Sequence, residues 1–167
     1  MLGKPIVCTY WNIGGYWSKN LGNKLEDPEF LQVIEESDII GLGELHSDKK
    51  LSIPGFISID QKIREKKFKG PKIAGGIGVF VRKELHHIVQ AIPNENDDSI
   101  WIRISKKYTG EQSDLFIGTY YGSPPSKKRG TASNFFDNLH EEINSFSKKG
   151  ILFKVILTPE LEMASMV

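Results

Sequence analysis

The chain has 167 residues, of which 39% are hydrophobic and 26% charged, as in a soluble globular protein with one domain and a real core. Its 22 basic and 21 acidic residues leave a formal net charge of +1, so composition alone argues against a polyanionic partner, and nucleic-acid contact would need local clusters of positive charge. One cysteine, Cys8, excludes an internal disulfide and predicts a small buried hydrophobe in a reducing compartment.

No run approaches ~18 consecutive apolar residues, the length that a membrane-spanning helix needs. The start, Met-Leu-Gly-Lys, lacks the hydrophobic region of a signal peptide. We therefore expect an intracellular protein, cytoplasmic or nuclear, with no membrane partner.

Residues 5–11 form an apolar and β-branched run that predicts a first strand, with Asn12 at its carboxyl end before a glycine-containing turn. Asp27 before Pro28 indicates the start of a short helix. Residues 39–45 then read as a strand buried on both faces. A strand, a helix and a buried strand predict a βαβ-like opening that brings the ends of the two strands together.

Glu44 is the only residue between Ile39 and Leu45 that is neither apolar nor glycine. A buried carboxylate needs a cation, hydrogen-bond donors or water, because leaving it unpaired in an apolar setting is costly. Glu44 could emerge into solvent at the strand end. We favour a functional site, because ligands of open α/β sheets bind beyond the carboxyl ends of strands.

Residues 53–59, broken by Pro54 and Gly55, are a weak strand candidate, and a basic run follows them. We favour a solvated loop for this run over a loop that contacts phosphate. Residues 75–82 predict a glycine-rich strand and are not a P-loop, because no Gly-Lys-Ser/Thr ends them.

Residues 88–92 and 99–105 predict successive strands, and in the second the isoleucines alternate with Trp101 and Arg103, as in a sheet with unlike faces. His86 and His87 would point opposite ways on an extended segment, so we favour surface histidines over a zinc site.

Residues 114–121 predict a strand that ends in two tyrosines before prolines. An amphipathic helix follows from residue 133 to a stop at Gly150, and residues 151–157 predict one more strand. We expect this last strand to lie inside a sheet and to expose an apolar face. The strands favour two stacked sheets flanked by helices.

Four motifs occur in order: Tyr-Trp-Asn-Ile-Gly-Gly at 10–15, Asp-Ile-Ile-Gly-Leu-Gly-Glu-Leu-His at 38–46, Gly-Gly-Ile-Gly-Val-Phe-Val-Arg at 75–82, and Tyr-Tyr-Gly-Ser-Pro at 120–124. With them the chain resembles the endonuclease/exonuclease/phosphatase superfamily, and most of all the endonuclease domains of non-LTR retrotransposons. The resemblance implies an α/β (α+β) fold, a four-layered α/β sandwich, and hydrolysis of DNA phosphodiesters that depends on Mg²⁺, with Mn²⁺ as a possible substitute.

The resemblance also implies roles for individual residues. Asn12 matches the active-site asparagine of the family, and Glu44 matches its metal-binding glutamate. Tyr121 matches the tyrosine that contacts phosphate, with Tyr120 in its place if the register slips by one. His46 follows Glu44 where the family often has Thr-His, and we expect it to support the site.

The family's Gly-Asp-x-Asn and Ser-Asp-His motifs are absent, and Thr158-Pro159-Glu160-Leu161 stands where the first of them would begin. We therefore expect residues 1–157 to be a partial domain without its carboxyl-terminal half. The unrelated tail, residues 158–167, resembles the product of a frameshift, a mis-spliced exon or a truncated gene model.

Two hypotheses of function follow. In the first, the chain is part of a Mg²⁺-dependent DNA endonuclease. In the second, it is a non-catalytic remnant that binds nucleic acid or another partner. For these 167 residues alone we favour an inactive protein. In either case the candidate nucleic-acid-binding residues are Lys66, Lys67, Lys69, Lys72, Lys127, Lys128 and Arg129.

Overall fold

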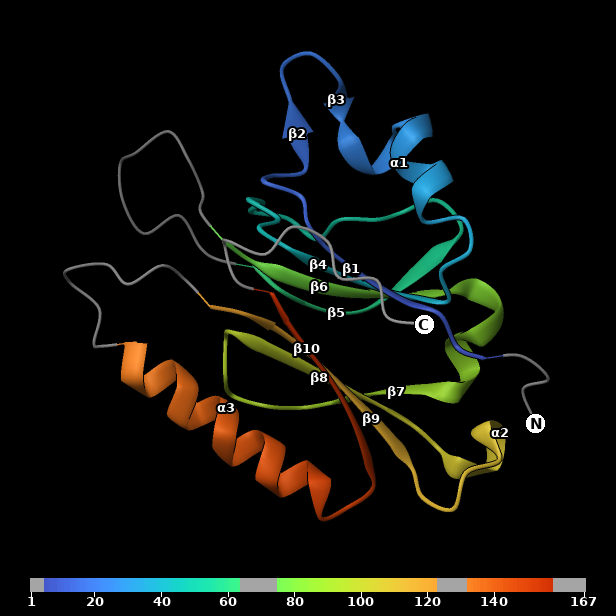
Figure 1. Cartoon of the computed structure of the whole chain (residues 1–167). Helices are drawn as coiled ribbons and strands as arrows, with labels where there is room; N and C mark the ends of the chain where they lie inside the picture. The colour runs from blue at the N-terminus through green and yellow to red at the C-terminus, as the bar shows by residue number, and fades with distance from the viewer. Residues whose placement is uncertain (1–4, 64–74, 123–131, 158–167) are drawn as a thin grey trace.

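The computed structural model describes residues 5–63, 75–122 and 132–157 (Figure 1). Residues 64–74, which hold most of the basic run that starts at Lys62, residues 123–131 and the tail, residues 158–167, lie outside the described residues. The basic candidates outside them are Lys66, Lys67, Lys69, Lys72, Lys127, Lys128 and Arg129. Among the described helices, none is long and apolar enough to cross a membrane.

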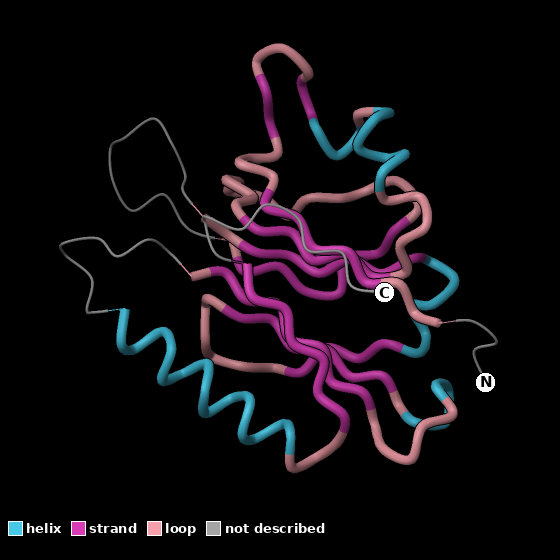
Figure 2. Tube along the Cα trace, viewed as in Figure 1, coloured by secondary structure: helices cyan, strands magenta, loops and turns pink. Residues whose placement is uncertain are grey.

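Eight of the ten described strands form two four-stranded sheets that face each other (Figure 2). The first has the order β1 (Cys8–Asn12), β4 (Ile39–Gly43), β6 (Ile77–Arg82), β5 (Phe56–Lys62). The second has the order β10 (Ile151–Leu157), β9 (Leu115–Tyr121), β8 (Ser99–Ile104), β7 (Val89–Ile92). Isoleucine and valine side chains from both sheets form one buried cluster between them, as sheet packing requires.

Helices cover the outer faces of the two sheets. Helix α3 (Ala132–Ser147) packs Leu139 and Phe146 on Trp101 of the second sheet. Helix α1 (Pro28–Val33) packs Phe30 among residues of the first sheet. The two stacked sheets with flanking helices that the sequence predicts are therefore observed. The alternation in β8 is also observed, because its isoleucines face the other sheet while Trp101 faces α3.

The βαβ-like opening is confirmed. Strands β1 and β4 pair in parallel, with Asn12 opposite Gly43. A 3₁₀ helix, η1 (Lys24–Glu26), precedes α1, and Asp27 caps α1 by accepting from two backbone amides of its first turn. A Cβ added at Gly41 of β4 would lie 2.4 Å from Tyr10 Cδ1, so only glycine lets the tyrosine ring cross β4 at this point.

Most strand predictions differ from the observed bounds by one to three residues at one end or both, and in two of them the reason is local. The strand expected at residues 53–59 starts only at Phe56, because Pro54 and Gly55 form a turn in which Gly55 has a φ of +83°. The strand expected at 88–92 starts at Val89, because Ile88 ends the 3₁₀ helix η2 (Lys83–Ile88). His86 and His87 therefore lie on a helix and not on an extended segment.

The strand at residues 151–157 does not lie inside its sheet. β10 pairs in parallel with β9 and forms an edge among the described strands. The crossover through α3 returns the chain beside β9, and no described strand pairs on the other side. Two further elements escaped the sequence analysis: a hairpin of β2 (Trp17–Ser18) and β3 (Gly22–Asn23), and helix α2 (Lys106–Thr109) after Ser105.

Candidate active site

Glu44 and His46 follow β4 in an unusual backbone conformation. Their φ angles are +54° and +49°, in the left-handed region where residues other than glycine are uncommon and strained. Such strain persists only where neighbouring structure imposes it, and it is concentrated at functional sites. The backbone of this segment therefore points to a functional site, as the single carboxylate in its sequence does.

Hydrogen bonds on both sides impose this conformation. On one side Leu45 N donates to Gly76 O at 3.2 Å and His46 N to Gly75 O at 2.9 Å. On the other side Gly15 N donates to Glu44 O at 2.7 Å. The loops that follow β1 and precede β6 thus clamp the segment, so the direction of the Glu44 side chain is set by three parts of the chain.

The Glu44 carboxylate joins the two sheets. Tyr121, at the carboxyl end of β9, is 3% exposed, and its hydroxyl donates to Glu44 Oε1 at 2.8 Å. Tyr120 points to the opposite face of the sheet and packs with Trp101 under α3. The alternation of a strand decides between the two tyrosines, and the structure sets Tyr121 against Glu44.

Asn12 and His46 lie at the same end of the molecule. Asn12 pairs with Gly43, the residue before Glu44, and its Oδ1 accepts from Gly14 N at 3.1 Å, which holds the turn after β1. His46 Nε2 lies 3.9 Å from Glu44 Oε2. Asn12, Glu44 and Tyr121 therefore lie at the same end of the two sheets, and Glu44 and Tyr121 are in direct contact.

Gly15 provides the room for His46. A Cβ at Gly15 would lie 3.1 Å from His46 Nδ1, and its φ of +96° is itself accessible mainly to glycine. Gly15, the second glycine of the Asn-Ile-Gly-Gly motif, thus has a packing role: it lets the turn after β1 approach the imidazole of His46.

Glu44 is a suitable ligand for a hard cation. Its side chain is 21% exposed, and a carboxylate oxygen that accepts one hydrogen bond still has a free lone pair. Mg²⁺ usually binds through one or two carboxylates and completes its shell with water and substrate phosphate. No cluster of three or more His, Cys, Asp or Glu side chains occurs in the described parts of the chain. The residues present therefore fit an ion held by one protein carboxylate.

A second carboxylate, Glu142 on α3, escaped the sequence analysis. It accepts hydrogen bonds from Tyr120 OH at 2.8 Å, Trp101 Nε1 at 2.7 Å, Ser99 Oγ at 2.9 Å and Asn96 Nδ2 at 3.0 Å. Burial first, and then the hydrogen bond to Glu142 and its charge, raise the pKa of Tyr120 above its ordinary range.

The sequence held a signal for this network. Glu142 lies three residues after Leu139 and four before Phe146, which are both buried, so it interrupts the apolar face of the helix. An acid on such a face needs donors, and these come from the sheet beneath and from the loop before β8.

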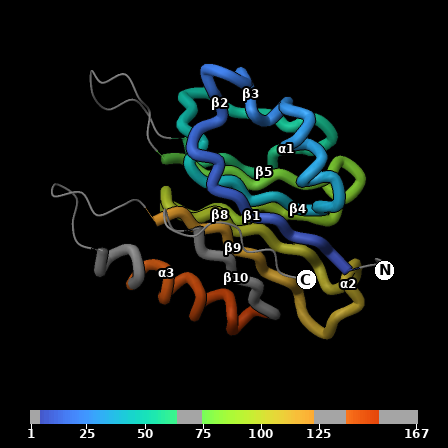
Figure 3. Tube along the Cα trace, turned by 45° about the horizontal axis from the view of Figure 1, so that its top comes forward, coloured from blue at the N-terminus to red at the C-terminus, as the bar shows by residue number. Residues whose placement is uncertain are grey.

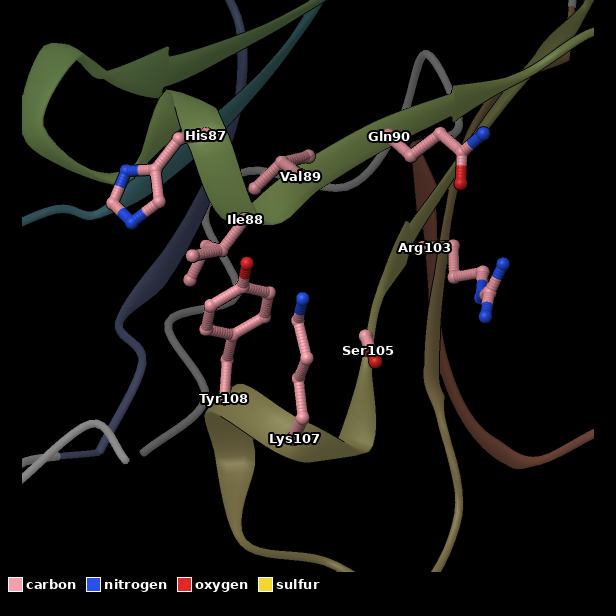
Figure 4. A pocket seen from close by; sticks show the side chains of 8 residues that line it. All are labelled: His87, Ile88, Val89, Gln90, Arg103, Ser105, Lys107 and Tyr108. Atoms are coloured by element: carbon pink, nitrogen blue, oxygen red, sulfur yellow. The ribbon is translucent and has the colours of Figure 1, made fainter.

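A pocket of about 420 Å³ lies at the other end of the second sheet (Figure 4). It is near the end of β8, which pairs with the start of β9 and so lies away from Tyr121. Arg103, which lines this pocket, forms an ion pair with Asp114, with 2.6 Å between Nη2 and Oδ2. The residues that line it are His87, Ile88, Val89, Gln90, Arg103, Ser105, Lys107 and Tyr108.

No protein-family model and no curated protein matches the chain. Solved structures do match it. The human Nocturnin catalytic domain with bound sulfate aligns with a TM-score of 0.58 and 14% identity, over 92% of this chain and 63% of that one. The mannosyl-6-phosphatase Bt3783 of Bacteroides thetaiotaomicron aligns with a TM-score of 0.58 and 15% identity, over 92% and 64%.

These likenesses show the fold of the chain. Both proteins have the endonuclease/exonuclease/phosphatase fold, so the mixed α/β architecture that the sequence motifs implied is of that type. The chain spans less than two thirds of the length of either protein.

Proposed function

We propose that this chain is part of a metal-dependent phosphodiesterase of the endonuclease/exonuclease/phosphatase superfamily, related to retrotransposon endonucleases and acting on DNA. The observation that carries the proposal is the hydrogen bond from Tyr121 to Glu44. It lies beyond the carboxyl ends of the parallel strands β1 and β4. The fold is shared with a phosphatase and with a sulfate-bound catalytic domain. In this proposal α1, the two sheets and α3 are the layers of the four-layered sandwich, and residues 1–157 supply its amino-terminal part.

The side chains divide the work as follows. Glu44 would hold Mg²⁺ or Mn²⁺, which when bound would neutralise charge on a substrate phosphate. Tyr121 donates a hydrogen bond to a phosphate oxygen, for which its single hydroxyl proton turns away from Glu44 Oε1. Asn12 orients a water or a substrate oxygen through its amide, and His46 supports the Glu44 carboxylate from 3.9 Å.

DNA as the substrate is supported by where the two basic runs join the described chain. The run that contains Lys66, Lys67, Lys69 and Lys72 ends just before Gly75, whose carbonyl accepts from His46 N. The run that contains Lys127, Lys128 and Arg129 begins shortly after Tyr121. In the sequence, both runs are thus close to residues of this rim, and positive charge suits a phosphate backbone.

We further propose that the 167 residues alone do not hydrolyse DNA. The sequence lacks the Gly-Asp-x-Asn and Ser-Asp-His motifs that supply the water-activating residues of the family, and the described residues hold no group of three or more His, Cys, Asp or Glu side chains that could bind a metal. Loss of a general base and of transition-state contacts typically removes ~10²–10⁴-fold each in rate. The alternative function is a non-catalytic domain that binds nucleic acid.

Two measurements on the purified chain test these proposals. Binding of Mn²⁺, followed by electron paramagnetic resonance, should be weak and should be lost in Glu44→Ala. It should be kept in Glu84→Ala, which removes an exposed carboxylate on η2. Equal Mn²⁺ binding in Glu44→Ala would refute the metal site.

Nicking of a supercoiled plasmid with Mg²⁺ or Mn²⁺ should stay at background. Nicking that disappears in Glu44→Ala and persists in Glu84→Ala would show instead that a full catalytic set is present.

A further inference from the structure

The β2–β3 hairpin lies beyond the first sheet (Figures 1 and 3). It carries two exposed apolar side chains. Trp17 is 62% exposed and Leu21 is 63% exposed, more than any other large hydrophobic side chain that the structure describes. A tryptophan held in water on a two-residue strand contributes little to folding. Large aromatic side chains displayed in this way are typical of binding surfaces.

The hairpin is held in one conformation before any partner arrives. Ser18 Oγ accepts from Asn20 N at 3.3 Å and from Leu21 N at 3.4 Å, which closes the turn. At its base Lys24 N donates to Tyr16 O at 2.8 Å and Lys24 Nζ donates to Ile13 O at 2.7 Å. The tryptophan is therefore presented by a fixed backbone, which lowers the entropy lost on binding.

The hairpin is continuous with the candidate active site. Gly15 N donates to Glu44 O at 2.7 Å, and Tyr16 N donates to Leu45 O at 3.0 Å. Trp17 is the next residue. A ligand with a phosphate at Glu44 would thus have its adjoining groups within reach of the hairpin.

Charge and size decide which partner suits this surface. Residues 13–25 contain Lys19 and Lys24 and no acidic residue, and Lys49 Nζ lies 5.9 Å from the centre of the Tyr16 ring. Two side chains are too few for the core of a stable protein interface, which buries about 800 Å² on each partner. A nucleobase needs only one aromatic face, and cations beside aromatic rings are the usual platform for single-stranded nucleic acid.

We propose that Trp17 is a stacking platform for an unpaired base of a DNA strand whose phosphate lies at Glu44, with Leu21 flanking the base and Lys19 contacting the backbone. The inference rests on the proposed function for the class of substrate. It adds that the site selects single-stranded or frayed DNA next to the phosphate that it holds.

Intrinsic fluorescence tests the proposal directly. The chain has three tryptophans; Trp101 is fully buried and Trp11 stacks on Phe30 with ring centroids 5.4 Å apart, so quenching by DNA reports mainly on Trp17. A short oligodeoxythymidylate should quench the emission. By fluorescence anisotropy of the labelled oligonucleotide, Trp17→Ala should bind roughly 5- to 150-fold more weakly.

Two controls separate stacking from general effects. Val33→Ala removes another exposed apolar side chain, 55% exposed on α1, and should bind as the unaltered chain does. An abasic oligonucleotide of the same length and charge should bind the unaltered chain and Trp17→Ala equally.

Unchanged binding of oligodeoxythymidylate by Trp17→Ala would overturn the proposal. So would self-association, seen by light scattering, that is lost in Trp17→Ala while DNA binding is kept, because the surface would then join two protein chains. Glu44→Gln separates the two proposals. If it leaves Mn²⁺ binding intact while Trp17→Ala weakens DNA binding, the metal site fails and the stacking platform stands. If Glu44→Gln loses Mn²⁺ binding while Trp17→Ala binds DNA as the unaltered chain does, the metal site stands and the stacking platform fails.

Discussion

Glu142 offers the sharpest test of the packing between α3 and the second sheet. Three of the donors that it satisfies, on Ser99, Trp101 and Tyr120, belong to residues with no exposed surface. The substitution Glu142→Ala removes the acceptor of all three at once. Because the donors lie under the helix, they do not simply turn to bulk solvent.

The size of the effect follows from these contacts. Each buried donor without a partner costs ~1–3 kcal/mol. Water that enters the space left by the half-buried Glu142 side chain offsets part of that cost. We therefore expect Glu142→Ala to lower the free energy of unfolding by about 3–5 kcal/mol, a large share of the ~5–15 kcal/mol that stabilises a typical domain.

The assay is urea denaturation followed by circular dichroism, with Glu141→Ala as the matched control. Glu141 is the exposed neighbour on the same helix, so its replacement changes helix propensity equally and leaves the network intact. Glu142→Gln keeps the volume and one acceptor oxygen and should fall between the two. A loss below about 1 kcal/mol in Glu142→Ala, or an equal loss in Glu141→Ala, would refute the role of the network.

Four other outcomes are expected. Burial raises the pKa of Cys8 from 9.0 to about 12, so the native thiol should resist iodoacetamide at mildly alkaline pH. The same shift makes the folded chain hold a proton that the unfolded chain releases, so stability should fall as the pH rises from 9 toward 12, and a rise in urea midpoint over that range would contradict it. Gly41→Ala should cost about 1–3 kcal/mol, measured by urea, because its Cβ would meet the Tyr10 ring at 2.4 Å; an unchanged midpoint would show that the ring moves freely. Tyr121→Phe should lower stability by only about 0.5–2 kcal/mol in the same assay, because Glu44, left without that donor, is partly open to water, and a larger loss would mean that the carboxylate is buried more tightly than its 21% exposure indicates.

Local patterns in the sequence were enough for several elements. The Asp27-Pro28 start of α1 and the two strands around it were predictable because capping and strand periodicity depend on neighbouring residues. The alternating faces of β8 were predictable for the same reason. Glu44 stood out because a single acid in an otherwise apolar segment is rare.

Other features depended on contacts between distant parts of the chain. The choice of Tyr121 over Tyr120 against Glu44 required the two sheets to face each other, since either tyrosine fits the end of a strand. The position of β10 at a sheet edge followed from the crossover through α3. The donors of Glu142 come from residues more than twenty positions away in the chain. Sequence periodicity assigns a residue to one face of one element, and only tertiary packing decides which other element meets that face.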